Sequence, residues 1–133
     1  MNRLSLVAIV AAVALMGLSC GGDGPVQSGP GVLKVRLTAP AANADSAIVF
    51  TITGPAPLTS VTVGTGLRLF QQPLGGTSTR FALTGLMTNG ATILTIGVPD
   101  IGALSQYSGS VDGVAQANYQ LRSLPGYALA LTR

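Results

Sequence analysis

From residue 32 onward, apolar and polar side chains alternate along the chain in short runs. In VLKVRLT (32–38), Leu33, Val35 and Leu37 share one face of an extended strand, while Lys34 and Arg36 share the other. Seven further runs have the same period: AIVFTIT (47–53), SVTV (60–63), LRLF (67–70), RFALT (80–84), TILTIGV (92–98), YSGSV (107–111) and YALALT (127–132). This period is typical of strands with one buried face, so the pattern predicts about eight short strands.

Turn-forming residues separate these runs. They are Ala39-Pro40, Gly54-Pro55, Gly64, Gly75-Gly76, Asn89-Gly90, Pro99-Asp100 and Pro125-Gly126. No segment after residue 31 has a sustained helical stripe of apolar residues. Strands with one apolar face must bury those faces against one another. We therefore expect an all-β fold, a single antiparallel β-sandwich of about eight strands, with a partly closed barrel as the alternative.

The first nineteen residues follow a different pattern. Arg3 precedes an apolar stretch of fifteen residues, 4–18, that contains no charge. Such a stretch behind a positive charge is typical of a helical secretion signal, and it is shorter than the ~20 residues that span a bilayer. The only A-x-A cleavage pattern in these nineteen residues, Ala12-Val13-Ala14, lies inside the apolar stretch, where an ordinary signal peptidase site is not expected.

The stretch Met16-Gly17-Leu18-Ser19-Cys20 holds the only cysteine of the chain. It resembles the lipobox of bacterial lipoproteins, although Gly17 stands where that motif commonly has leucine. The resemblance implies cleavage between Ser19 and Cys20, with attachment of fatty acyl chains such as palmitate at Cys20. Two or three acyl chains hold a protein durably to a membrane. By the same resemblance, Gly21 in place of aspartate favours the outer membrane over the inner one, with the chain in the cell envelope.

These patterns divide the chain into three parts. Residues 1–19 are the expected lipoprotein signal peptide, and 20–31 are the lipidated cysteine with a flexible tether, rich in glycine and proline. Residues 32–133 are one β-sandwich domain of ordinary size. This domain resembles the immunoglobulin-like and cohesin-like sandwiches of bacterial surface proteins in its strand rhythm, in SAIVFTITGP (46–55) and in GYALALTR (126–133). The resemblance implies a role in contact or display and carries over no site residues.

The side-chain inventory argues against catalysis. The chain has no histidine and no glutamate, so zinc sites of the Cys/His kind and Ser-His-Asp arrangements are excluded. Ser-Lys chemistry would need Lys34, the only lysine, in an exposed strand position. Asp45, Asp100 and Asp112 each fall in an expected turn, where aspartate bonds nearby backbone amides, and three isolated carboxylates make a poor calcium site. We expect no enzyme activity, no cofactor and no metal.

The charged side chains also limit the classes of partner that we expect. Six basic and four acidic side chains follow Cys20, scattered rather than gathered into a basic patch, so nucleic acid is not expected as a partner. The expected partners are the membrane, through the lipid on Cys20, and an envelope protein. The expected function is a non-catalytic binding or scaffolding module; the alternative is an accessory subunit of a larger cell-surface or outer-membrane assembly.

One stretch near the C-terminus lacks alternation. It is VAQANYQLRSLPG (114–126), which contains Tyr119 and Arg122, two residue types that often anchor interfaces. Loops on a rigid sandwich are where binding commonly lies, so we expect Tyr119 and Arg122 as contact residues. The alternative is that Tyr119 caps the core and Arg122 is merely solvated. Tyr107 and Tyr127 share faces with apolar neighbours and are expected in the core.

Overall fold

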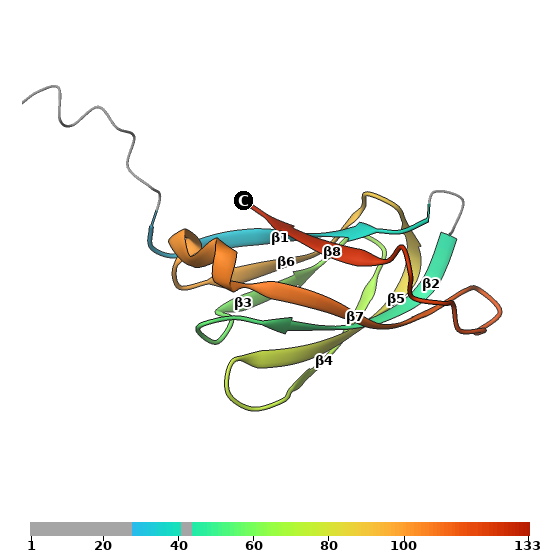
Figure 1. Cartoon of the computed structure of the whole chain (residues 1–133), viewed down its shortest axis with the longest axis horizontal. Helices are drawn as coiled ribbons and strands as arrows, with labels where there is room; N and C mark the ends of the chain where they lie inside the picture. Colours follow the sequence, from blue (N-terminus) through green and yellow to red (C-terminus); the bar gives the residue numbers. More distant parts are fainter. Residues whose placement is uncertain (1–27, 41–43) are drawn as a thin grey trace, which may run out of the picture.

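The computed structural model describes residues 28–40 and 44–133. Eight strands form two antiparallel sheets of four, packed face to face, and one short 3-10 helix lies at an end of the sandwich (Figure 1). The predicted all-β sandwich of eight strands is confirmed. The expected signal helix, Cys20 and most of the tether lie outside the described residues.

The strands alternate between the sheets in a regular way. The first sheet has the order β3 (Ser60–Val63), β6 (Thr92–Val98), β1 (Gly31–Thr38) and β8 (Ala128–Thr132). The second has the order β4 (Arg68–Pro73), β5 (Ser78–Thr88), β2 (Ala44–Thr53) and β7 (Ser108–Ala115). Read in these orders, consecutive strands lie opposite one another across the sandwich, so β1 faces β2 and β7 faces β8. The outer edges of the sandwich are therefore the pairs β3/β4 and β7/β8.

The core consists of the faces that the alternation assigns to the inside. Leu33, Val35 and Leu37 of β1 are buried, and so are Ile48, Phe50 and Ile52 of β2. Phe50 stands opposite Phe81 of β5, and their ring centroids are 5.5 Å apart. This cross-strand aromatic pair lies at the centre of the second sheet, where it packs beneath the apolar face of the first.

A short helix, which the sequence pattern does not predict, closes one end of the sandwich. The 3-10 helix η1 (Ile101–Gln106) begins after Asp100, whose carboxylate accepts hydrogen bonds from the Gly102 and Gly29 amides at 2.9 and 3.0 Å. It delivers Tyr107 onto the core, where the side chain is buried as expected. The Tyr107 ring lies directly over Gly54, which has no side chain to obstruct it.

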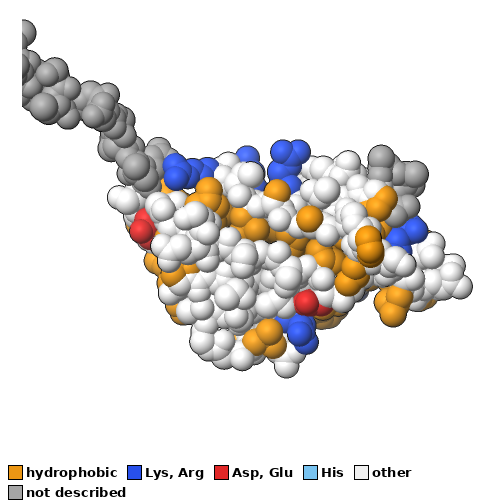
Figure 2. Space-filling model, viewed as in Figure 1, with side chains coloured by type: hydrophobic (Ala, Val, Ile, Leu, Met, Phe, Trp, Pro, Cys, Tyr) orange, Lys and Arg blue, Asp and Glu red, His pale blue; other side chains and the backbone are white. Residues whose placement is uncertain are grey.

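The two lateral sides of the sandwich differ. On the β7/β8 side, Gly109 lets Leu129 and Ile52 approach the backbone closely, and hydrophobic side chains form a band along β8 (Figure 2). On the β3/β4 side, a cleft of about 400 Å³ separates the edge strands. Its lining includes Leu58, Val61 and Leu69, which pack against the core, and no charged residue. The β7/β8 side is therefore filled by apolar side chains, whereas the β3/β4 side contains a cleft.

Candidate functional site

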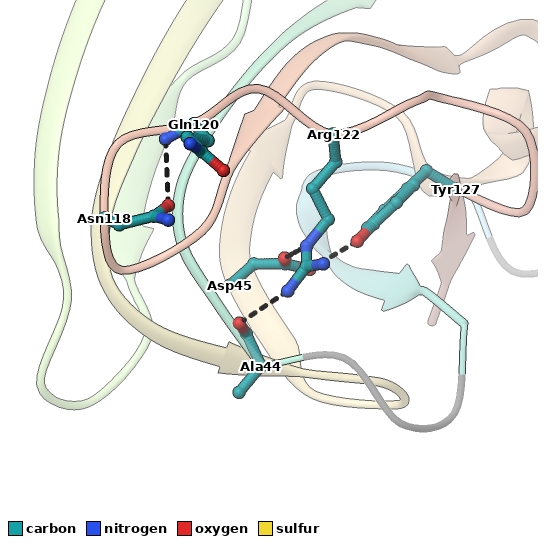
Figure 3. Close-up of polar contacts among 6 residues, drawn as sticks. All are labelled: Ala44, Asp45, Asn118, Gln120, Arg122 and Tyr127. Atoms are coloured by element: carbon teal, nitrogen blue, oxygen red, sulfur yellow. Dashed lines mark hydrogen bonds and ion pairs between the residues drawn. The ribbon is translucent and has the colours of Figure 1, made fainter.

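The loop between β7 and β8, residues 116–127, is an ordered structure, which we call the contact loop. Its tip is a tight turn in which the Tyr119 amide donates to the Gln116 carbonyl at 2.9 Å and the Gln116 amide donates to the Gln120 carbonyl at 3.0 Å. The Asn118 side chain accepts from the Gln120 amide at 3.1 Å (Figure 3). These bonds hold the tip in one conformation.

Two large side chains on this loop point into solvent. Tyr119 is 86% exposed and Leu121 is 81% exposed. Tyr119 adopts a left-handed backbone conformation with φ of 63°, the only non-glycine residue among those described to do so. Such a conformation costs about 1–3 kcal/mol for a residue with a side chain. Tyr119 is therefore held outward by the turn, and the alternative that it caps the core is wrong.

The base of the contact loop is attached to the sandwich. Leu121 forms an isolated bridge with Ala115 at the end of β7, and the Arg122 amide donates to the Val114 carbonyl at 2.8 Å. The chain thus runs back along β7 before it enters β8. Val114 and Ala115, which the sequence pattern assigned to the irregular stretch, belong to β7.

Arg122 points inward, toward β2. Its Nε donates to Asp45 Oδ1 at 2.5 Å, and its Nη2 donates to the Ala44 carbonyl at 3.2 Å (Figure 3). Tyr127, at the C-terminal end of the loop, donates its hydroxyl to Asp45 Oδ2 at 2.8 Å. Both oxygens of one carboxylate therefore receive a donor from the contact loop, and the alternative of a merely solvated Arg122 is wrong.

The burial of Asp45 makes these contacts important for the stability of the fold. Its side chain is fully buried, whereas that of Arg122 is 21% exposed. A buried carboxylate without a partner is strongly unfavourable, because it loses its hydration. The donors from Arg122 and Tyr127 supply that partner only when the loop is in place, so Asp45 fastens the middle and the C-terminal end of the contact loop to β2. The apolar pattern does not predict this role; the available signal was a charged residue two positions before the apolar run 47–53.

The other two aspartates among the described residues, Asp100 and Asp112, also make structural contacts. Asp100 forms the turn expected of it, before η1. The prediction of a turn at Asp112 is wrong, because Asp112 lies in β7. There its carboxylate accepts a hydrogen bond from the Thr51 hydroxyl at 2.7 Å and forms an ion pair with Arg80 at 3.8 Å. Asp45 likewise belongs to β2, beside a register shift opposite β5, rather than to a turn.

In the described part of the chain, no cluster of metal-ligating side chains competes with the contact loop as a candidate site. In residues 28–40 and 44–133, no three histidine, cysteine or acidic side chains come together. Within the same ranges, no helix has the length and apolar character needed to cross a bilayer. The chemistry of the contact loop itself is that of an exposed aromatic and an exposed aliphatic side chain on a fastened support.

Comparison of the chain with protein-family models, with curated proteins and with solved structures found no match.

Proposed function

We propose that the protein is a lipid-anchored lipoprotein of the bacterial cell envelope, in the outer membrane, and that it acts by contact rather than by catalysis. The observation that carries the contact role is the pair Tyr119 and Leu121, exposed by 86% and 81% next to the points where the Ala115–Leu121 bridge and the Arg122–Asp45 ion pair hold the loop. Preformed apolar side chains bind with a small entropic cost, because the loop needs no further ordering. The partner is an envelope protein with an apolar pocket.

The anchoring part of the proposal rests on Arg3, the apolar stretch and Ser19-Cys20 in the sequence. Mass spectrometry of the mature N-terminus tests it directly. We expect a chain that begins at Cys20 and carries acyl groups there. A mature chain that begins at Met1, or at any residue other than Cys20, contradicts the proposal.

The contact part is tested by the double variant Tyr119→Ser with Leu121→Ser. Both side chains are exposed, so the melting temperature should stay unchanged while the cross-linked envelope partner is lost. The matched control is Val32→Ser with Leu86→Ser, which removes two exposed side chains elsewhere, at 54% and 75% exposure. The control should retain the partner. If the Tyr119/Leu121 variant retains it too, the loop is not the contact surface.

The alternative function is an accessory subunit of a larger surface assembly. The finer classification as an immunoglobulin-like or cohesin-like sandwich belongs to this proposal as well, and rests on strand rhythm and on the stretches SAIVFTITGP (46–55) and GYALALTR (126–133). In either function, the two exposed residues of the contact loop provide the surface that meets the partner.

A further inference from the structure

Strand β4 has an edge that differs from the other three edges of the sandwich. Among the described strands, only β5 pairs with β4. Phe70, in the middle of β4, is 59% exposed. By contrast, β3 has four residues, β7 is extended by its bridge to Leu121, and the exposed side chains of β8 are alanine and threonine. An exposed edge with a large apolar side chain at its centre is a template for pairing with another strand.

The hydrogen bonds of the β4–β5 hairpin show which backbone groups of β4 are directed outward. The Leu74 amide donates to the Ser78 carbonyl at 3.0 Å, so residue 74 faces β5. Because direction alternates along an antiparallel strand without a register shift, Phe70 and Gln72 also bond to β5. The backbone groups of Leu69 and Gln71 therefore point to the open edge. Pro73 points there too, and it has no amide hydrogen to offer.

This edge is complementary to itself. We propose that β4 pairs with β4 of a second copy of the chain in antiparallel register, centred on Phe70. In that register, Leu69 lies opposite Gln71 of the second copy, and both outward-facing residues exchange amide–carbonyl bonds. The two-fold axis passes at Phe70, so the same pairing occurs a second time, between Gln71 of the first copy and Leu69 of the second, as in any isologous contact. Phe70 then faces Phe70 of the second copy at a position without backbone hydrogen bonds, where side chains approach most closely.

Charge and space are compatible with this register. Arg68 lies opposite Gln72 of the second copy, so the two Arg68 side chains are displaced by four residues, about 14 Å along the strands. That distance exceeds the screening length of roughly 8 Å in physiological salt, so repulsion is weak. The cleft between β3 and β4 keeps β3 clear of the pairing edge. In the second sheet, β4 and β7 form opposite edges, so the pairing leaves the contact loop beyond β7 free.

Disulfide cross-linking tests both the dimer and its register. The full chain carries Arg68→Cys together with Gln72→Cys, is expressed in cells, and is oxidised in isolated membranes. The two new cysteines are four residues apart on one strand, too far apart to join each other. In the proposed register, the cysteine at position 68 of one copy lies opposite the cysteine at position 72 of the other copy, at a distance that a disulfide spans. We expect a disulfide-linked dimer of the chain.

Controls separate this pairing from random collision. Arg68→Cys alone and Gln72→Cys alone should give only the background of the unchanged chain, whose one cysteine is Cys20. Adding Gln71→Pro to the double-cysteine chain removes an amide that points to the open edge and should abolish the dimer. Equal cross-linking by the single variants, no dimer from the double variant, or cross-links only to other proteins would each overturn the proposal. Loss of the contact-loop partner does not affect this readout.

Discussion

At the scale of single residues, Asp45 links the contact loop to the sandwich. It lies in β2, and its two partners follow it by 77 and 82 positions. A local pattern of apolar and polar residues contains no information on which distant cation will meet a buried carboxylate. The pattern therefore predicted a turn at Asp45 and, for Arg122, either a contact residue or a solvated side chain. It placed Tyr107 in the core correctly, because that assignment needed only the alternation within its own run.

Removal of Arg122 should be far more costly than removal of an exposed arginine. In Arg122→Leu, the fully buried Asp45 carboxylate loses its charged partner, and we expect a loss of about 3–5 kcal/mol in the free energy of unfolding. Arg80→Leu is the matched control, because its ion pair with Asp112 is 3.8 Å long and half exposed; we expect a loss of about 0–1 kcal/mol. Urea titration measures both. Similar losses in the two variants would contradict the anchoring role of Asp45.

Tyr107 should make stability depend on alkaline pH. Burial raises the pKa of its hydroxyl above the usual value of about 10, and the Asp100 carboxylate raises it further. The unfolded chain then loses this proton at a lower pH than the folded chain does. The contribution of this raised pKa to the free energy of unfolding is complete below pH 10 and is lost as the pH rises through the folded-state pKa.

The free energy of unfolding, measured from pH 9 to pH 11.5, should fall less steeply for Tyr107→Phe than for the unchanged protein. Phenylalanine keeps the ring over Gly54 and has no proton to lose. Other tyrosines contribute equally to both proteins, so the difference between the two curves isolates Tyr107. Identical slopes would show that the folded state does not favour the neutral hydroxyl.

At the scale of elements, alternation was sufficient to locate every strand. The runs 60–63 and 92–98 coincide with β3 and β6, and the other strands differ from their runs mainly at the ends. The helix η1 was missed because six residues are too few to establish a helical period. Register shifts in the strand pairs β1–β6, β2–β5 and β2–β7 were not predicted either, since they depend on how neighbouring strands pair.

The junction between η1 and β2 depends on one glycine. A Cβ atom at residue 54 would overlap the Tyr107 ring, so Gly54→Ala should lower the free energy of unfolding by about 1–3 kcal/mol. Gly113→Ala is the control, because nothing lies within 4 Å of the added carbon and its backbone is not left-handed. Thermal melting compares them. A Gly54→Ala protein as stable as Gly113→Ala would mean that η1 and Tyr107 do not pack on β2.

At the scale of the whole molecule, the two sheets depend on a single core. Each strand crosses to the opposite sheet after its turn, except for the β4–β5 hairpin, so neither sheet consists of one continuous segment. Ile52 of β2 and Leu129 of β8 both approach Gly109, and thereby join strands of both sheets. Loss of one sheet would expose the apolar face of the other. We therefore expect the sandwich to unfold as one cooperative unit.

A charge in this shared core should unfold both sheets together. Ile52 is 1% exposed, so Ile52→Asp buries an unpaired carboxylate and should cost more than about 4 kcal/mol, a large share of the stability of a domain of this size. The control is Thr53→Asp, at the exposed next position, with an effect within about 0.5 kcal/mol. Far-UV circular dichroism follows the backbone, and tyrosine fluorescence follows the environments of Tyr107, Tyr119 and Tyr127, of which Tyr107 is buried in the core. The two signals should disappear together in Ile52→Asp, because the strands that hold Tyr107 in place belong to the same core as the rest. A variant that lost the tyrosine signal but kept half of its β-signal would show instead that one sheet is stable alone.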